Sequence, residues 1–283
     1  MENTQTVLLN NDDAYFAYKA LSASQIKTYA TAGAYDFWKS SVFNPEKKPD
    51  EETDALIFGK LAHCMLFEQE EVENRFLIMD WGTKTRGTKK YEDAKAANPN
   101  KTLISPAEYE KAGKMLACLR DHRLAREIIN GAYCEKPFIW TDKATGLPMK
   151  CKMDAFKRTN YGLVIIDYKT SSDIDGVLRR GEKFQYPLQD ACYCEAAKEK
   201  YGEEPVEFVF ILQSNKDGEE DKICVANVDV ESRSYAKDLY ASVKNEIATK
   251  LQLWDETKDP TIWAAYPERV TMGYSSWYLD NGY

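Results

Sequence analysis

Histidine and closely paired cysteine are scarce in this sequence. His63 and His122 are the only histidines among 283 residues, too few for a zinc site built from several histidines. Only Cys192 and Cys194 lie close together, and the sequence contains neither a CxxC pair nor a ferredoxin-like cluster of cysteines. The other cysteines are Cys64, Cys118, Cys134, Cys151 and Cys224. We therefore expect reduced, buried cysteines and neither zinc nor an iron–sulfur cluster.

Long apolar segments are absent as well. No run approaches the ~20 residues that a membrane-spanning helix needs. The start from Met1 to Asn11 lacks the basic and apolar parts of a secretory signal. Together with the odd number of cysteines, these absences favour a cytoplasmic protein with no membrane partner. A length of 283 residues, 43% of them hydrophobic and 30% charged, suits one large globular domain or two small ones.

An excess of positive charge is also missing. The formal net charge of −8 at pH 7 argues superficially against a nucleic-acid partner, although a protein that encloses its substrate around an acidic site can be acidic overall. Two basic clusters stand out, at residues 84–90 and 179–183. A solvated loop and an exposed helix end explain them equally well. The acidic run at residues 50–54 is a poor candidate for a surface that faces nucleic acid.

Apolar periodicity and capping residues predict the long helices. A Ser-rich start at residue 22 and the Ser105-Pro106 pair are typical helix N-termini. The predicted helices are residues 22–38, 55–67, 106–129, 187–202 and 232–254. The polar segment at residues 81–100, with two glycines and a proline, is interpreted as a mobile loop or lid.

Runs rich in β-branched and aromatic residues predict the strands. The predicted strands are residues 135–141, 149–156, 163–169, 206–212 and 223–230. The first three follow one another closely and are interpreted as a β-meander. The order of elements predicts one α/β domain with a mixed sheet at residues 21–283. An extension at 1–20 precedes it, and it ends in an aromatic tail at 255–283, which would pack on a neighbouring subunit or in its own core.

The strand at 163–169 carries the clearest chemistry. Side chains alternate along a strand, so Asp167 and Lys169 share one face while Tyr168 points to the other. Asp154 lies on the preceding predicted strand, and Glu135 on the one before it. Taken alone, an Asp and a Lys two residues apart are explained equally well by a surface salt bridge. The buried run before them, together with Asp154, favours a catalytic site.

Two carboxylates beside a lysine suit the hydrolysis of a phosphodiester with a divalent metal. Asp154 and Asp167 would supply hard oxygen ligands to magnesium, and the backbone carbonyl of Tyr168 could add a third. Lys169 would orient the attacking water and counter the phosphate charge. Glu135 is a candidate extra ligand or outer base. The sequence therefore predicts a magnesium-dependent phosphodiesterase site.

Two predicted helices add polar residues to this site. Gln189 and Tyr193 stand at i and i+4, so they project together. Gly59 and His63 share a helix face in the same way, and Gly59 could clear space beside the imidazole. Alone, His63 is better explained as a core histidine. Its Gly-x-x-x-His spacing in this context favours a functional role.

At these residues the sequence resembles a known family. Asp154 followed by Asp167-x-Lys169 is similar to the PD-(D/E)xK nuclease signature, with Met153 where the pattern has proline. More closely, the chain resembles the C-terminal nuclease domain of exonuclease VIII, the RecE family, from about residue 20 onward. The segments that carry this resemblance are 21–24, 58–63, 135–140, 151–154, 166–170, 186–193 and 263–277.

The resemblance implies a fold, an activity and partners. The fold would be a PD-(D/E)xK restriction-endonuclease-like core with a mixed central sheet flanked by helices. The activity would be Mg²⁺-dependent digestion of linear double-stranded DNA from 5′ to 3′, with Mn²⁺ able to substitute, which leaves 3′ single-stranded overhangs for recombination by strand annealing. A ring-shaped homo-oligomer and a RecT-like single-strand annealing protein are implied, in the cytoplasm of a prokaryotic or phage-infected cell.

The resemblance also assigns roles to residues. The implied catalytic residues are His63, Glu135, Asp154, Asp167, Lys169 and Gln189, with His63 joining Asp154, Asp167 and the Tyr168 carbonyl near the metal. Tyr193 would support the site or contact DNA. Ser22 and Ser24 would begin a helix near the DNA end, where a helix N-terminus suits a terminal phosphate.

A ring would reconcile the negative net charge with DNA binding, because basic residues can line a channel inside an acidic surface. The residues expected to face DNA are Arg86, Lys89, Arg179 and Arg180, so binding should weaken with salt.

Two alternative functions stay open: a nuclease of the same fold with another substrate preference, such as an endonuclease or single-strand nuclease, and an inactive DNA-binding assembly protein. The intact Asp154, Asp167 and Lys169 argue against the inactive protein.

Overall fold

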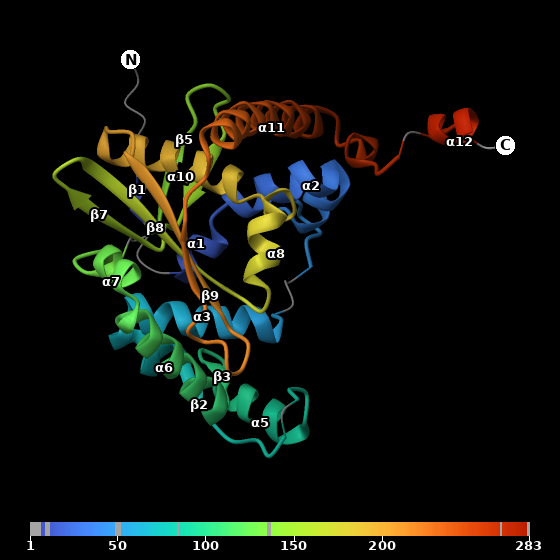
Figure 1. Ribbon diagram of the computed structural model, residues 1–283. Helices are drawn as coiled ribbons and strands as arrows, with labels where there is room; N and C mark the ends of the chain where they lie inside the picture. The colour runs from blue at the N-terminus through green and yellow to red at the C-terminus, as the bar shows by residue number, and fades with distance from the viewer. Residues whose placement is uncertain are drawn as a thin grey trace.

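The described part of the chain comprises residues 7–8, 12–48, 52–83, 85–134, 137–266 and 268–281 of a computed structural model (Figure 1). Its strands are β1 (Val7–Leu8), β2 (Phe76–Ile78), β3 (Thr102–Ile104), β4 (Tyr133–Cys134), β5 (Phe138–Thr141), β6 (Pro148–Cys151), β7 (Ala155–Thr159), β8 (Gly162–Ser171), β9 (Glu207–Ser214) and β10 (Ile223–Ala226). Its helices are α1 (Asp12–Ala17), α2 (Ala23–Ser40), α3 (Asp54–Phe67), α4 (Val72–Arg75), α5 (Lys89–Ala97), α6 (Pro106–Asp121), α7 (Arg123–Ile129), α8 (Ile174–Arg179), α9 (Gly181–Phe184), α10 (Tyr186–Tyr201), α11 (Val230–Thr257) and α12 (Ser276–Asn281). Two 3₁₀ turns, η1 (Gln69–Glu71) and η2 (Pro260–Trp263), complete them.

A five-stranded mixed sheet lies at the centre, in the order β10-β9-β8-β7-β4. Strands β8 and β9 run parallel, and the other neighbours run antiparallel. The longest strand, β8, forms in the middle because its run of β-branched residues is buried on both faces. The predicted α/β class with a mixed central sheet flanked by helices is confirmed.

Helices cover both faces of this sheet and bury two separate apolar clusters (Figure 1). Leu163 and Ile165 of β8 pack with residues of α2, α10 and α11, whereas Ile166 and Tyr168 pack with residues of α3 and α6. Because side chains alternate, Asp167 points to the same side as Ile165, toward α2 and α10. The predicted opposite orientation of Tyr168 is confirmed.

The predicted β-meander is wrong, because its middle strand is interrupted. Residues 149–156 divide into β6 and β7, which belong to different sheets. Strand β6 pairs with β5, and β5 with β1, whereas β7 pairs with β8. At residues 152–154 the chain leaves both ladders, and the Lys152 carbonyl accepts a hydrogen bond from a side chain of α10 instead. Asp154 therefore lies at the junction of two sheets and not within a strand.

The prediction of a mobile loop at residues 81–100 is also wrong. Most of its second half is helix α5, which Thr88 caps by accepting a hydrogen bond from the Tyr91 N–H at 3.3 Å. Trp81 and Tyr91 are buried against Leu103 of β3, which pairs in parallel with β2. These two aromatic side chains hold the segment against the body despite its polar composition.

Two predicted boundaries are corrected by capping residues. The long helix expected at 106–129 breaks at His122, whose Nδ1 accepts from the Ala125 N–H at 3.2 Å and so starts α7 afresh. The strand expected at 223–230 ends at Ala226, because Asp229 accepts from the Ser232 N–H at 2.9 Å and begins α11. In both cases a side chain satisfies a free N–H at a helix start.

The aromatic tail divides into a buried and an exposed part. Trp263 of η2 is buried and stacks on Trp38 of α2, with ring centroids 4.5 Å apart. Beyond it Met272 and Trp277 are 93% and 71% exposed, and α12 projects away from the body (Figure 1). The first part thus packs in its own core, whereas packing of the rest on a neighbouring subunit stays a prediction.

Lys150 of β6 ties the N-terminal helix to the body. Its buried ammonium group donates to the backbone carbonyls of Tyr15 and Tyr18, each at 3.0 Å, at the end of α1.

The seven cysteines all carry free thiols, four of them buried. Among the described residues, no helix combines the length and the apolar composition needed to cross a bilayer.

Candidate active site

Asp167 and Lys169 of β8 form a buried ion pair. The Asp167 side chain is fully buried, and its Oδ2 lies 2.5 Å from Nζ of Lys169, a side chain that is 28% exposed. Burial raises the pKa of Asp167 to about 6, an effect that Lys169 opposes and Asp154 reinforces. The pair is therefore not a surface salt bridge, because one partner has no access to water.

Asp154 lies beside this pair, at the interruption between β6 and β7. Its Oδ1 is 3.0 Å from His63 Nε2, and its Oδ2 accepts from the Tyr168 N–H at 2.8 Å. Burial alone would raise the pKa of Asp154, but His63 and Lys169 outweigh burial and lower it to about 2. Asp154 is thus held ionised, while Asp167 in the same network is harder to ionise. Such divergent pKa values in neighbouring carboxylates are typical of functional sites.

His63 projects from α3 toward Asp154. Burial alone would lower its pKa, but the Asp154 carboxylate raises it above the ordinary value. The imidazole is therefore partnered by a site carboxylate and is not a core histidine. A Cβ placed on Gly59 would meet only Thr170 Oγ1, at 3.8 Å, so the interpretation that Gly59 clears space beside His63 is wrong.

Gln189 and Tyr193 of α10 both reach the segments that carry the carboxylates. Gln189 Nε2 donates to Asp167 Oδ1 at 2.5 Å, and Gln189 is only 4% exposed. The Tyr193 hydroxyl donates to the Lys152 carbonyl at 3.2 Å and so holds the bend that presents Asp154. The predicted joint projection of the two side chains is confirmed, whereas DNA contact by Tyr193 stays a prediction.

Replacing Tyr193 by phenylalanine should loosen this bend. We expect the free energy of unfolding to fall by about 1 kcal/mol, the usual contribution of one neutral hydrogen bond. The DNA cleavage that the resemblance implies should fall modestly, because Asp154 is less well held. Urea denaturation and a DNA cleavage assay measure the two effects. Tyr161→Phe, at a side chain 89% exposed, is the matched control. An unchanged Tyr193→Phe variant would show that the bend does not depend on this hydroxyl.

One residue of the network, Lys27 of α2, was not predicted from the sequence. Its Nζ donates to Gln189 Oε1 at 3.1 Å, and the ammonium lies over the Tyr186 ring, 5.6 Å from the centroid. Burial, and then the charge of Lys169, lowers the pKa of Lys27 to about 8. The one sequence signal was its place one turn after Ser24 on the first helix, which by itself does not distinguish it from a solvated lysine.

Ser22 and Ser24 lie at the start of the same helix. Ser22 is buried, and its N–H donates to Gln25 Oε1 at 3.1 Å, as in a capping box. The two hydroxyl oxygens are 2.9 Å apart, and Ser24 is exposed. The predicted helix start is confirmed, and its contact with a DNA end stays a prediction.

The basic residues predicted to face DNA occupy different surroundings. Arg86 is held between Asp54 at 2.6 Å and Glu108 at 2.7 Å, and its side chain is 13% exposed. Both carboxylates engage the guanidinium, so a DNA phosphate would have to compete with these ion pairs, and DNA contact by Arg86 stays a prediction. Lys89 and Arg179 are exposed. Arg180 is exposed too and pairs with Asp173 at 2.8 Å.

The donors at this site suit a divalent metal in chemical type. Asp154 and Asp167 offer hard carboxylate oxygens, and Asp167 Oδ2, although paired with Lys169, is buried without a hydrogen bond of good geometry. Over the described ranges, no three His, Cys, Asp or Glu side chains converge into a metal cluster. Glu135, the predicted extra ligand, lies outside the described residues. Two carboxylates fit magnesium, which commonly keeps several waters and few protein ligands.

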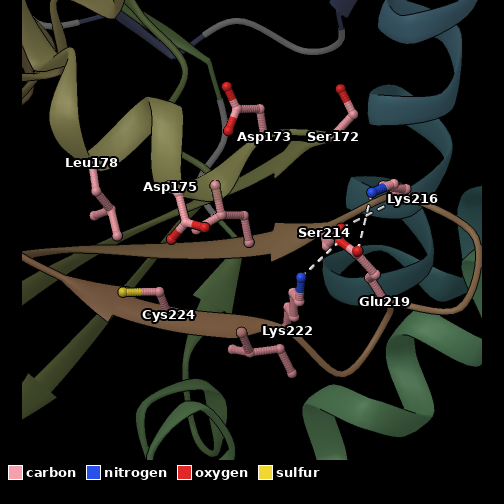
Figure 2. A pocket seen from close by; sticks show the side chains of 11 residues that line it. Ser172, Asp173, Asp175, Leu178, Ser214, Lys216, Glu219, Lys222 and Cys224 are labelled. Carbon is pink, nitrogen blue, oxygen red and sulfur yellow. Dashed lines mark hydrogen bonds and ion pairs between the residues drawn. The ribbon is translucent and has the colours of Figure 1, made fainter.

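A separate pocket opens between α8 and the β9–β10 hairpin (Figure 2). Its volume is about 410 Å³, and Asp175, Leu178 and Cys224 are among the side chains that line it. Lys216 and Lys222 both pair with Glu219 there, at 3.1 and 3.0 Å. The lining does not include the buried carboxylates, so the pocket is not the candidate active site.

Comparisons with known proteins agree with this fold. The family model described as "PDDEXK-like domain of unknown function (DUF3799)" matches residues 22–264. A solved structure from Eubacterium rectale, described as a "putative exonuclease", is similar at 16% identity over 97% of this chain and 99% of that chain, with a TM-score of 0.56. At that identity the likeness shows the fold. No curated protein matches this chain.

The family match runs from the start of α2 to the end of η2. It therefore includes α2, α3, β8 and α10, the elements that position the buried network around Asp154 and Asp167. The predicted PD-(D/E)xK nuclease domain is confirmed at the level of the superfamily, whereas the assignment of its signature to Asp154, Asp167 and Lys169 stays a prediction. This chain belongs to the DUF3799 family of PDDEXK-like domains, which have the PD-(D/E)xK nuclease fold.

Proposed function

We propose that this protein is a metal-dependent exodeoxyribonuclease that digests linear double-stranded DNA from 5′ to 3′ and leaves 3′ single-stranded overhangs. The observation that carries the proposal is the buried network of Asp154, Asp167 and Lys169 in a chain of the PDDEXK-like family. The preference for DNA ends rests on the resemblance to the RecE family. The description of the E. rectale neighbour as an exonuclease supports it.

Each residue of the network has a role in this proposal. Asp154, Asp167 and the Tyr168 carbonyl would hold Mg²⁺, or Mn²⁺ in its place, next to His63. The metal would supply a Lewis acid for the phosphate and lower the pKa of a bound water. Lys169, the exposed end of the buried pair, would orient the attacking water and counter charge on the phosphate. Gln189 would keep Asp167 in place.

The DNA path and the partners follow from the same proposal. Ser22 and Ser24 at the N-terminus of α2 would receive the terminal phosphate, while Lys89, Arg179 and Arg180 would contact the backbone further along. We also propose a ring-shaped homo-oligomer, cytoplasmic location and a RecT-like single-strand annealing protein as partner. At Arg86 a phosphate would have to compete with its two carboxylate partners.

A cleavage assay with matched DNA substrates tests the activity. We expect Mg²⁺ to support degradation of linear duplex DNA, with release of a 5′ label before a 3′ label, and we expect EDTA to stop it. A closed circular duplex of the same sequence should stay intact under the same conditions. Cutting of the circle would identify an endonuclease, and degradation of single strands alone a single-strand nuclease. Binding of DNA without any cleavage would identify the inactive assembly protein.

A further inference from the structure

Lys27, Gln189 and Asp167 form a chain of hydrogen bonds from three different elements. Lys27 Nζ of α2 donates to Gln189 Oε1 of α10 at 3.1 Å, and Gln189 Nε2 donates to Asp167 Oδ1 of β8 at 2.5 Å. Gln189 and Asp167 are 4% and 0% exposed, so water cannot easily replace either bond. The chain therefore links a half-buried cation to a buried carboxylate through a single amide.

The chemistry of the three groups fixes the orientation of that amide. An ammonium group only donates and a carboxylate only accepts, whereas an amide has one accepting end and one donating end. Lys27 therefore requires the Gln189 oxygen, and Asp167 requires the Gln189 nitrogen. A flipped amide would place its NH₂ against the ammonium and its oxygen against the carboxylate. The buried surroundings make both mismatches costly.

We propose that Lys27 is a positioning residue for the reaction, because it holds the Gln189 amide in the orientation that fixes Asp167 Oδ1. With that oxygen tied to Gln189, Oδ2 is left for Lys169 and the metal ion. This inference rests on the proposed function, in which Asp167 is a metal ligand. It adds a lysine that lies outside the signature motif and more than a hundred residues before it in the chain.

A direct contact between Lys27 and a DNA phosphate is the competing role for such a cation. The observed geometry favours positioning, since the ammonium is engaged by Gln189 and lies against the Tyr186 ring. The side chain is only half-buried, so the two roles must be separated by measurement. Positioning predicts weaker metal binding with unchanged KM for DNA, whereas a DNA contact predicts a raised KM with unchanged metal binding.

The test compares Lys27→Met, Gln189→Met and the double variant with the wild-type protein. Lys27→Met should weaken Mn²⁺ binding, measured by calorimetry on metal-free protein, and lower kcat, each by about 10- to 100-fold, the usual effect of losing an outer partner of a metal ligand. KM for linear duplex DNA should change by less than about twofold. In Mn²⁺ affinity and kcat, the double variant should lose no more than the more impaired single variant, because both substitutions break the same chain of hydrogen bonds.

Two controls separate this role from a structural one. Lys39→Met removes an exposed lysine from the same helix and should leave every value unchanged. Lys27→Arg keeps the charge and the donor and should restore part of the Mn²⁺ affinity. Circular dichroism and urea denaturation should show that Lys27→Met is folded.

Other outcomes would overturn the inference. A raised KM with a weaker salt dependence and unchanged Mn²⁺ affinity would make Lys27 a DNA contact. Additive losses in the double variant would show that Lys27 does not act through Gln189. If the wild-type protein binds Mn²⁺ but cuts no DNA, the proposed function fails while the calorimetry still decides the role of Lys27. If it binds no Mn²⁺, both fail.

Discussion

Asp167→Asn is expected to reduce DNA cleavage by about 10³-fold or more without unfolding the protein. The substitution preserves the shape of the side chain, but it removes the charge that would hold the metal, a contribution of several kcal/mol to the transition state. Single-turnover cleavage of linear duplex DNA with saturating Mg²⁺ measures the effect. The carboxylate is fully buried and touches both Lys169 and Gln189, so no surface group can replace it.

Asp36→Asn on the exposed face of α2 is the matched control for that experiment. It changes the same functional group and the same net charge, but at a side chain in contact with solvent. We expect wild-type activity from it. Activity of Asp167→Asn within tenfold of the wild-type value would show that the buried pair on β8 does not carry the reaction, and the candidate active site would have to be sought elsewhere.

Asp154→Asn is expected to destabilise the metal-free protein in a way that depends on pH. The pKa of Asp154 is lowered from 3.8 to about 2, so its contribution to stability is present above pH 3.8 and lost as pH falls toward 2. The pKa of His63 is raised above 6.5, so its contribution is present below pH 6.5 and lost as pH rises through the raised value. The loss on substitution should therefore be largest between these limits.

Urea denaturation in EDTA from pH 4 to pH 9 measures this difference. We expect a loss of about 1–3 kcal/mol near pH 5–6, the cost of leaving one partner of a buried polar pair alone, and a smaller loss at pH 9. The Asp36→Asn variant should show no such pH dependence. A loss for Asp154→Asn that stays constant over this range would mean that Asp154 and His63 are not an ionic pair.

The central strand of the site could be predicted from the sequence because its signal is local. A run of β-branched residues before Asp167 indicates a buried strand, and alternation then places Lys169 on the same face. Gln189 and Tyr193 share a helix face for a similarly local reason. The place of His63 near the metal, in the same site as Asp154, came only from the resemblance to known nucleases, because no spacing in the sequence relates α3 to Asp154.

Apart from the two boundaries that local caps correct, the errors arose where contacts with another element override the local pattern. The strand expected at 149–156 breaks because the Tyr193 hydroxyl, 41 residues away, binds the Lys152 carbonyl. The expected loop at 81–100 is ordered because two buried aromatic side chains outweigh many polar ones. Lys27 was missed since a lysine on an amphipathic helix is usually solvated. In each case the decisive partner lies on another element, which a single sequence does not reveal.

The hydrogen bond between Lys27 and Gln189 joins residues 162 positions apart in the chain. Helices α2, α3 and α10 must therefore all meet strand β8 before the carboxylates acquire their partners. Local helices and strands can form early during folding, but contacts at such separation require most of the chain to be ordered. A fragment that contains only β8 and its neighbours would carry the signature motif without a competent site. Catalytic activity would therefore indicate that the complete tertiary structure has formed.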